Sequence, residues 1–261
     1  MSANDLTLSY PGFFESEKTE STVILRFSGN FFHNSIDFDK KNFFVEYLKK
    51  VNDAKDIDAV ILHSAYSGTG ENEYLDFFKR EHSRRGLSHF GFSSFMNLHE
   101  LNRYCNFLDQ FVMELIRIDK FIIHICSGDV LTQSLNIALA CDHRIIGDDT
   151  VFYNIFQDIG TIPKGGSIFF MEKLLGQSKT MELLLLQSQI SAVQALEYGL
   201  ADRMVAPAHI DKEAMTVVER IQKIPKGTVA GIKRLSSRSL KEFEAYLDRE
   251  TDEITRIGIK S

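Results

Sequence analysis

The stretch SGDVLTQSLNIALACDHRII, residues 127–146, joins a buried strand to a buried helix, and this unit decides how the rest of the chain is arranged. Its second half is apolar from Leu135 to Ala140, apart from Asn136, which predicts a buried helix. Its first half lies where a strand passes into that helix, and backbone N–H groups at such a turn often face a ligand. The turn residues, Thr132-Gln133-Ser134, include no glycine, although such turns usually contain one. This turn is therefore the first candidate for a functional site.

Strands and helices alternate outward from this unit in both directions. Apolar runs predict strands at 22–27, 57–63, 121–126, 150–153 and 204–205, and periodic patterns predict helices at 39–51, 98–115, 168–175, 179–186 and 192–198. The remainder is predicted to be helical with a break at 224–227. This alternation predicts an α/β fold built from right-handed βαβ units around a parallel sheet.

Length and composition limit the possible classes of protein. A chain of 261 residues can form one large α/β domain or a domain with a helical appendage. The formal net charge of −6 argues against a general nucleic-acid binder, which needs a basic surface. An anionic ligand would have to be bound by local Lys or Arg side chains, because the overall charge repels it.

The cysteines and the chain's apolar runs point to a cytoplasmic protein. Cys105, Cys126 and Cys141 form no CxxC pair, so we expect buried, reduced thiols. The first residues lack a basic start followed by an apolar run, so no targeting segment is predicted. The longest uncharged stretch after that, 183–196, is too short and too polar to span a bilayer, so no membrane association is expected.

Several runs of residues together resemble one known family. The clearest is the succession of Leu174-Leu175-Gly176, then MELLL at 181–185, then the run from Ala195 to Val205. The run from Ala138 to Ile145, ALACDHRI, and the GTIP of 160–163 are similar to two further motifs of the same family. From about residue 57 to 205, the chain resembles the crotonase (enoyl-CoA hydratase/isomerase) superfamily.

The resemblance implies an architecture and an assembly. It implies a crotonase-type ββα superhelix with a C-terminal helical extension. Residues 1–205 would form the crotonase core domain, and 206–261 a C-terminal helical trimerisation region. The chain would then assemble as a homotrimer or homohexamer.

The resemblance also implies an oxyanion hole, in which two backbone N–H groups polarise the carbonyl of an acyl thioester and stabilise an enolate. One N–H group would come from Gln133 and the other from Glu71, beside Gly70. Gln133 can donate its N–H unless the turn requires a positive φ, and the alternative is an ordinary turn that no longer fits a thioester. The substrate would be an acyl-CoA or acyl-carrier thioester, with coenzyme A as part of the substrate and no separate cofactor.

Two positions depart from the family's hydratase pattern. Where hydratases carry a pair of glutamates, this chain has Asn136 and Phe156. Asn136 is a polar replacement that does not exchange a proton near neutral pH, and Phe156 has no polar side-chain atom and would only contact the substrate. Losing one positioned acid or base typically costs about 10²–10⁴ in rate, which argues against ordinary enoyl-CoA hydratase activity.

Other charged residues could supply the missing proton transfer. If its segment is extended, Asp158 would point to the same side as Phe156 and could act as a catalytic base. Lys164 and Asp129 are also near the site, but such residues are more often solvated loop charges or caps. The loop acids Glu71 and Glu73 could also reach the pocket.

Coenzyme A phosphates would need cations. Lys233, Arg234 and Arg238 are the candidates; alternatively they form a solvated basic face that balances the acids Glu242, Glu244 and Asp248. The histidines at 82, 89 and 99 fit no standard metal spacing, so no metal is predicted, and His124 and His143 are interpreted as structural.

The sequence therefore supports three hypotheses. The first is a divergent lyase, isomerase or hydrolase that acts on an acyl thioester by enolate stabilisation. The second is a non-catalytic protein that binds acyl-CoA or serves in an assembly. The third is an enzyme of decarboxylation or carbon–carbon cleavage, in which an oxyanion hole suffices without the glutamate pair.

Overall fold

The computed structural model describes residues 6–28, 34–64, 76, 79–80, 82–83, 96–236 and 240–260. The strands are β1 (Leu8–Tyr10), β2 (Phe14–Thr19), β3 (Thr22–Phe27), β4 (Ala59–His63), β5 (Phe121–Cys126), β6 (Asp129–Leu131), β7 (His143–Gly147), β8 (Val151–Tyr153), β9 (Gln189–Ser191) and β10 (Arg203–Val205). The helices are α2 (Phe38–Asp53), α5 (Leu98–Arg117), α6 (Thr132–Ala138), α7 (Ser167–Leu175), α8 (Gln177–Leu185), α9 (Ala192–Glu197), α10 (Ile210–Ile221), α11 (Lys226–Ser236) and α12 (Leu240–Lys260), with a 3₁₀ turn at Pro207–His209.

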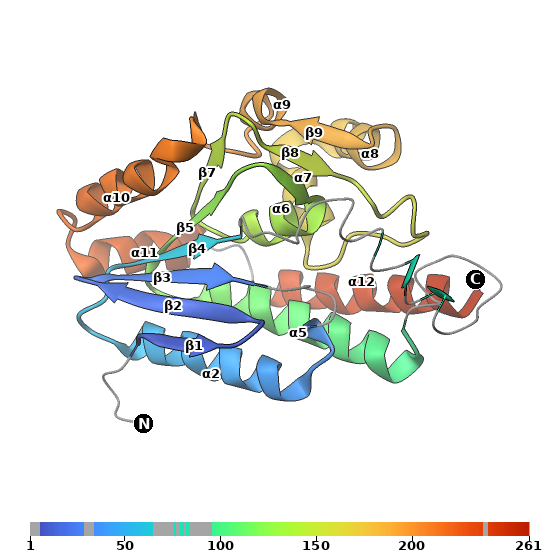
Figure 1. Cartoon of the computed structure of the whole chain (residues 1–261), viewed down its shortest axis with the longest axis horizontal. Helices are drawn as coiled ribbons and strands as arrows, with labels where there is room; N and C mark the ends of the chain where they lie inside the picture. The colour runs from blue at the N-terminus through green and yellow to red at the C-terminus, as the bar shows by residue number, and fades with distance from the viewer. Residues whose placement is uncertain are drawn as a thin grey trace.

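The larger sheet has the strand order β1-β2-β3-β4-β5-β7-β10 (Figure 1). From β3 to β10 all neighbouring strands are parallel, as the alternation of strands and helices predicts. The sheet is nevertheless mixed, because β1 and β2 add antiparallel strands at the β3 edge. The predicted parallel sheet is therefore confirmed from β3 to β10, and the antiparallel strands β1 and β2 were not predicted.

The hairpin at this edge is hard to detect in the sequence because one of its buried positions is polar. In β2 the buried side chains after Phe14 include Ser16, so the strand lacks a regular apolar alternation. The Ser16 hydroxyl donates to the Leu6 carbonyl at 2.9 Å and accepts from the Leu8 N–H at 3.0 Å. These bonds satisfy the hydroxyl and allow it to be buried.

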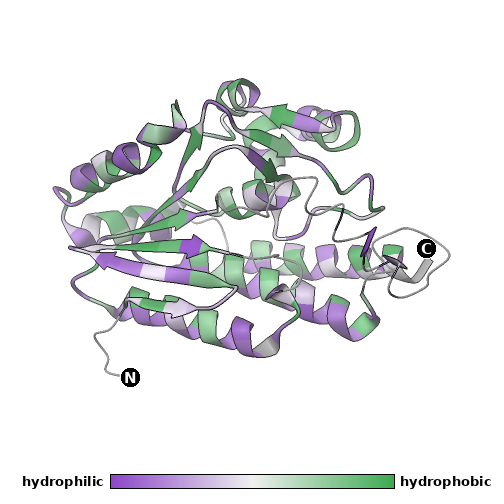
Figure 2. Ribbon diagram, viewed as in Figure 1, coloured by the Kyte–Doolittle hydropathy of each residue, from purple (hydrophilic) through white to green (hydrophobic). Residues whose placement is uncertain are grey.

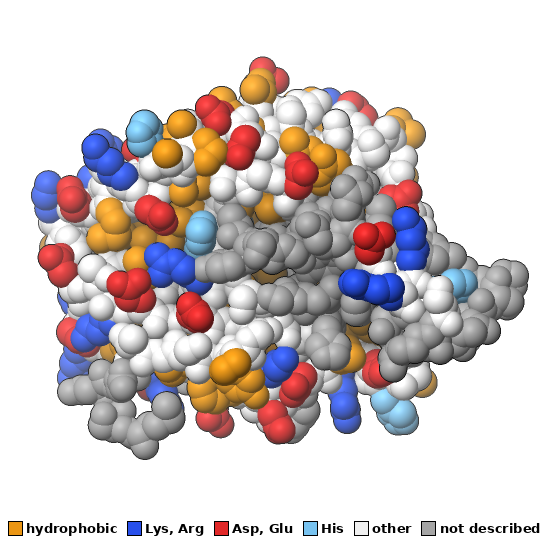
Figure 3. Space-filling view, in the orientation of Figure 1, with side chains coloured by type: hydrophobic (Ala, Val, Ile, Leu, Met, Phe, Trp, Pro, Cys, Tyr) orange, Lys and Arg blue, Asp and Glu red, His pale blue; other side chains and the backbone are white. Residues whose placement is uncertain are grey.

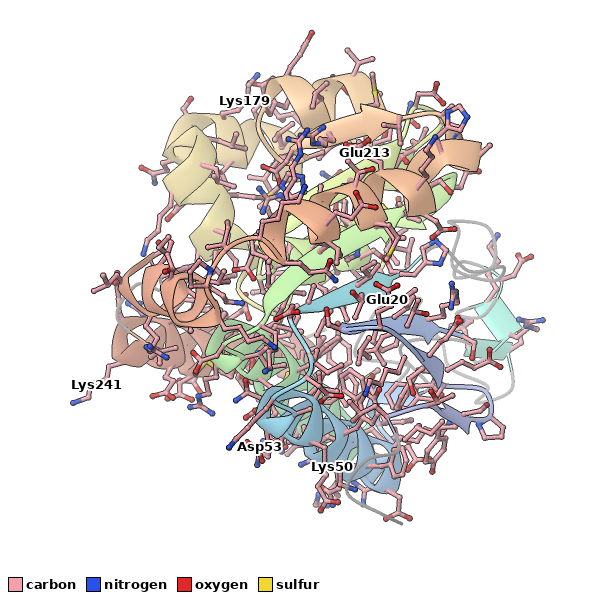
Figure 4. The ribbon with its side chains drawn as sticks, turned by 90° about the vertical axis from the view of Figure 1, so that its left-hand side faces the viewer. Glu20, Lys50, Asp53, Lys179, Glu213 and Lys241 are labelled. Carbon is pink, nitrogen blue, oxygen red and sulfur yellow. The ribbon has the colours of Figure 1, made fainter. Side chains whose placement is uncertain are left out.

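Helices cover both faces of the larger sheet. On one face, α2 and α5 pack over Val60, Leu62 and Ile122, and on the other face α10 packs over Ile123 and Ile125. Figure 2 shows that the helices carry hydrophobic and hydrophilic stripes, whereas β5 is mainly hydrophobic. Figure 4 shows α2, which carries the labelled Lys50 and Asp53, and α10, which carries Glu213, on separate sides of the strands. The buried runs predicted for the central strands are confirmed.

The smaller sheet, β6-β8-β9, supports the helix of the quoted stretch. β6 pairs in parallel with β8 and leads directly into α6. Leu135 of α6 and Leu139, the residue that ends it, pack with Cys126 of β5 and Phe152 of β8 in a second apolar cluster. This arrangement fixes α6 beside the larger sheet and places the turn at 132–134 at its N-terminus.

The cysteines and one histidine, His124, are buried in the interior. All three cysteines are free and buried, as predicted, and burial raises the pKa of the thiols of Cys105 and Cys126 to about 12. His124 in β5 is completely buried, with its Nε2 2.7 Å from the Ser64 hydroxyl. Its Nδ1 has no hydrogen-bond partner among the described residues, so it is only partly satisfied, and burial lowers its pKa to about 3.

The C-terminal helices pack against the rest of the chain. α12 lies along α5, as Figure 1 shows, and its buried residues Phe243, Leu247 and Ile254 belong to the main core. The boundary at residue 205 and the trimerisation role of 206–261 stay predictions. Among the described helices, none combines the length and apolar character that a bilayer-spanning helix needs.

Candidate active site

The turn that begins α6 keeps backbone N–H groups that no N-cap side chain covers. Leu131 is the N-cap residue, with an extended backbone, and makes no capping hydrogen bond. The first N–H groups of any α-helix lack acceptors within the helix, so those of Thr132 and Gln133 can serve a ligand. Gln133 lies in the helix with a negative φ, since Glu20 is the non-glycine residue with positive φ among those described. The absence of glycine is therefore no conformational obstacle to N–H donation.

The side chains of this turn are buried and bonded to one carbonyl. Gln133 is 4% exposed and Asn136 is 2% exposed. Gln133 Nε2 and Asn136 Nδ2 both donate to the Lys164 carbonyl oxygen, at 3.3 and 3.4 Å. Gln133 Oε1 accepts from the Tyr104 hydroxyl at 3.3 Å. The loop that carries Lys164 is thus joined to α6 through two amide side chains.

The segment with the second hydratase position is a turn, not an extended strand. Ile159 N–H donates to the Ile155 carbonyl at 3.1 Å, and Thr161 N–H donates to the Phe156 carbonyl at 2.9 Å. Phe156 is 3% exposed, whereas Asp158 is exposed. Asp158 was expected to point to the same side as Phe156 only if this segment is extended, and the turn does not meet that condition.

The sequence predicted that Lys164 is a solvated loop charge or a cap. This prediction is wrong, because the Lys164 side chain is 0% exposed. Its Nζ forms ion pairs with Asp109 of α5 and, at 3.1 Å, with Glu250 of α12. Burial acts to lower the pKa of Lys164, but the attraction of Glu250 and Asp109 outweighs it and raises the pKa above its ordinary value. Burial raises the pKa of both carboxyl groups, against the opposing effect of Lys164. The cluster holds two acids against one cation.

These three charged residues and Tyr104 were not singled out as a cluster in the sequence, although a signal was present. Asp109 lies four residues after Cys105 and three before Val112, which places its charge on the apolar face of α5. Glu250 follows Leu247 by three residues on the apolar face of α12. A charge on a buried helix face needs a partner, and Lys164 is that partner for both.

The cations proposed for coenzyme A phosphates are bound within the chain. Lys233 of α11 pairs with Asp142 at 2.5 Å and donates to the Lys120 carbonyl at 2.7 Å. Arg234 pairs with Asp119 at 3.0 Å. The acids that pair with these two cations are therefore Asp142 and Asp119, and not the acids at 242–248 that the alternative interpretation assumed.

The other candidates lie apart from this cluster or outside the described residues. Gly70, Glu71 and Glu73 lie outside the described residues, so the second N–H group of the expected oxyanion hole is not placed. Asp129 is exposed in β6, where its carboxylate accepts from the Tyr153 hydroxyl at 3.3 Å. No group of three or more possible metal ligands occurs among the described residues.

A pocket of about 450 Å³ lies at the opposite end of α6 from the turn. Its walls are mainly apolar and include Leu139, which follows α6, Phe169 and Phe170 of α7, Ile232 of α11 and Leu240 of α12. Of the predicted site residues that the structure describes, Lys233 alone is among its lining. The sequence did not predict this pocket, because its walls come from elements that are far apart in the chain.

The overall fold resembles that of one class of protein. The structure superimposes on an enoyl-CoA hydratase from Bacillus halodurans with a TM-score of 0.76, covering 94% of this chain and 95% of that chain at 19% identity. The family model for enoyl-CoA hydratase/isomerase matches residues 97–254. The chain belongs to the enoyl-CoA hydratase/isomerase (crotonase) family, as the sequence motifs indicated, with the α/β crotonase fold.

Two curated relatives show how far this membership extends. A trans-2-decenoyl-[acyl-carrier-protein] isomerase from Streptococcus mutans is 25% identical over 157 residues, which cover 60% of this chain and 60% of that protein. A probable mitochondrial enoyl-CoA hydratase from Dictyostelium discoideum is 32% identical over 126 residues, covering 48% and 46%. The chain thus spans between about half and 60% of the length of these relatives.

Proposed function

We propose that this protein binds an acyl thioester, carried by coenzyme A or by an acyl carrier protein, at the N-terminal turn of α6. The backbone N–H groups of Gln133 and Glu71 would polarise the thioester carbonyl and stabilise an enolate. The observation that carries the proposal is the uncapped start of α6, where Gln133 has helical geometry and its N–H needs no side-chain or glycine contribution.

The proposal excludes ordinary hydration of a double bond. Asn136 and Phe156 supply no acid or base, and Asn136 is bonded to a carbonyl. Asp158 is exposed, and its role as a base stays a prediction on which this proposal does not depend. Reactions in which the oxyanion hole does most of the work, such as decarboxylation of a malonyl-type thioester, fit these residues better than reactions that need a pair of glutamates.

The test is an activity assay with two substrates. Purified protein is incubated with crotonyl-CoA and with malonyl-CoA, and products are measured by mass spectrometry. The proposal expects no hydration of crotonyl-CoA at ordinary hydratase rates. Hydration at such rates would contradict it, and conversion of malonyl-CoA would support an enolate mechanism.

A non-catalytic binding or assembly role is the second candidate, and the burial of the side chains at the α6 turn favours it. Gln133, Asn136 and Phe156 are all buried, and the polar two are bonded within the chain. A thermal-shift panel of coenzyme A, several acyl-CoAs and an acyl carrier thioester separates the candidates. Stabilisation without any product favours a binding protein, and no stabilisation by any of them leaves only an assembly role.

We further propose that the chain forms a homotrimer or a dimer of trimers. α11 exposes Ile232 and Leu235, the latter 89% exposed, and the end of α8 exposes Leu185 and the C-cap residue Leu186. Figure 3 shows apolar side chains among charged ones at the top of the molecule, over α8 and α9. The family resemblance implies three-fold assembly, and these exposed apolar side chains offer surface for contacts between subunits, so light scattering should give a multiple of three chains. A monomer at all concentrations would contradict this.

A further inference from the structure

Lys164 binds two helices through its side chain. Besides Asp109 of α5 and Glu250 of α12, its Nζ donates to the Leu247 carbonyl of α12 at 3.2 Å. The carboxylate of Asp109 also accepts from the Thr251 hydroxyl at 3.3 Å. The ammonium group thus has three acceptors, and its position is fixed jointly by α5 and α12.

The backbone around Lys164 binds the α6 turn and α12 at the same time. Its carbonyl accepts from the side chains of Gln133 and Asn136. The N–H groups of Gly165 and Gly166 donate to the Glu250 carboxylate at 2.9 and 3.1 Å. A shift of Lys164 would therefore disturb the α6 turn on one side and the docking of α12 on the other.

We propose that Lys164 is a positioning residue, which holds the α6 turn in its ligand-binding geometry and couples that geometry to the docking of α12. The inference rests on the proposed function for what the turn binds. Lys164 itself touches no substrate in this account, because its side chain is completely buried.

The coupling follows from the cost of separating these groups. A buried ammonium must stay with its carboxylates, since leaving either partner alone in the interior is unfavourable. The carbonyl must stay with its two amide donors for the same reason, although each neutral bond contributes less. Movement of α12 away from the core therefore moves Lys164 or breaks the cluster, and movement of Lys164 releases Gln133 and Asn136.

The test compares two substitutions at Lys164 with a matched control. Lys164→Met removes the ammonium group, and Lys164→Arg keeps the positive charge. Lys173→Met is the control, because Lys173 of α7 also pairs with a glutamate of α12, Glu242, at 3.6 Å, but has no bond to the turn. Glu250→Gln is a second substitution in the same cluster, because it removes the carboxylate charge that binds Lys164 Nζ and the N–H groups of Gly165 and Gly166.

Two measurements are made on each full-length protein at a temperature where it is folded by circular dichroism. Hydrogen–deuterium exchange reports the peptides covering 127–138, and calorimetry reports the affinity for butyryl-CoA. We expect Lys164→Met and Glu250→Gln to speed exchange in 127–138 about tenfold and to weaken butyryl-CoA binding by a similar factor. Lys164→Arg should keep most of the wild-type protection from exchange and most of the affinity for butyryl-CoA. Lys173→Met should change neither the exchange rate in 127–138 nor the affinity by more than about twofold.

A merely structural role gives a different result. If exchange rises only in α12, or uniformly across the chain in step with the melting temperature, Lys164 does not position the turn and the inference is wrong. Should Lys164→Met fail to fold, Glu250→Gln decides by the same criteria. If the wild-type protein binds no thioester, the proposed function fails, whereas the exchange result still confirms or refutes the positioning role.

Discussion

Acidification should destabilise this protein through His124. This imidazole is completely buried, with a pKa near 3 in the folded chain, against an ordinary value of 6.5. Burial is the main cause, and the positive charges of His63 and Arg144 act in the same direction. Since the unfolded chain binds the proton more tightly, stability is complete above about pH 6.5 and is lost progressively as the pH falls towards 3.

The size of the effect follows from the two pKa values. One pKa unit corresponds to about 1.4 kcal/mol, so at pH 5 the free energy of unfolding should be lower by about 2 kcal/mol than at pH 8 from His124 alone. Urea denaturation at both pH values measures it. The loss in the wild-type protein should exceed the loss in His124→Gln by this amount, while other titrating groups, including His63 and His143, cancel in the comparison.

His209→Gln is the matched control, since this histidine is exposed on the 3₁₀ turn before α10. It should leave the pH dependence as in the wild-type protein. If His124→Gln shows the same loss of stability between pH 8 and pH 5 as the wild-type protein, burial does not keep this imidazole neutral, and the reasoning is refuted.

Two further predictions concern stability at neutral pH, measured as melting temperature and urea midpoint. Gly166→Ala should lower the free energy of unfolding by at least about 3 kcal/mol, because φ is +80° and a Cβ atom would lie 2.4 Å from the Phe243 ring. Gly160→Ala should lower it by about 1 kcal/mol, because φ is +66° but the space around the position is open. Equal costs would contradict the packing of α12 on this loop. Lys233→Met should cost about 3 kcal/mol, because it leaves a largely buried carboxylate without its cation, and Arg234→Met, in an exposed pair, less than about 1 kcal/mol. The opposite order would show that Lys233 is not held as described.

Much of the fold could be predicted from the sequence because its signals are local. Secondary structure follows directly from local patterns in four elements: apolar runs predict β3, β4 and β5, and a long amphipathic pattern predicts α5. The α5 start is also local, since Asn97 and Glu100 form a capping box. The antiparallel β1 and β2 were missed because a bonded serine replaces an apolar residue at a buried position.

The site was only partly predictable, because its decisive contacts join residues far apart in the chain. That Asn136 and Phe156 stand where hydratases of the family carry glutamates is a prediction from motif positions. The burial of Lys164 cannot be predicted in this way, because it depends on Asp109 and Glu250, which precede it by 55 residues and follow it by 86. The orientation of the Asp158 side chain was not predicted, because alternate side chains point to the same side in a strand but not in a turn, and this segment is a turn.

The most direct test of the proposed site is the carbonyl stretching frequency of a bound acyl-CoA labelled with ¹³C at its thioester carbonyl, measured by difference infrared spectroscopy. Donation from the Gln133 amide at the start of α6 should weaken the carbonyl bond and shift its band to lower frequency than in free solution. A bound ligand whose band stays at the solution frequency would contradict polarisation at this turn.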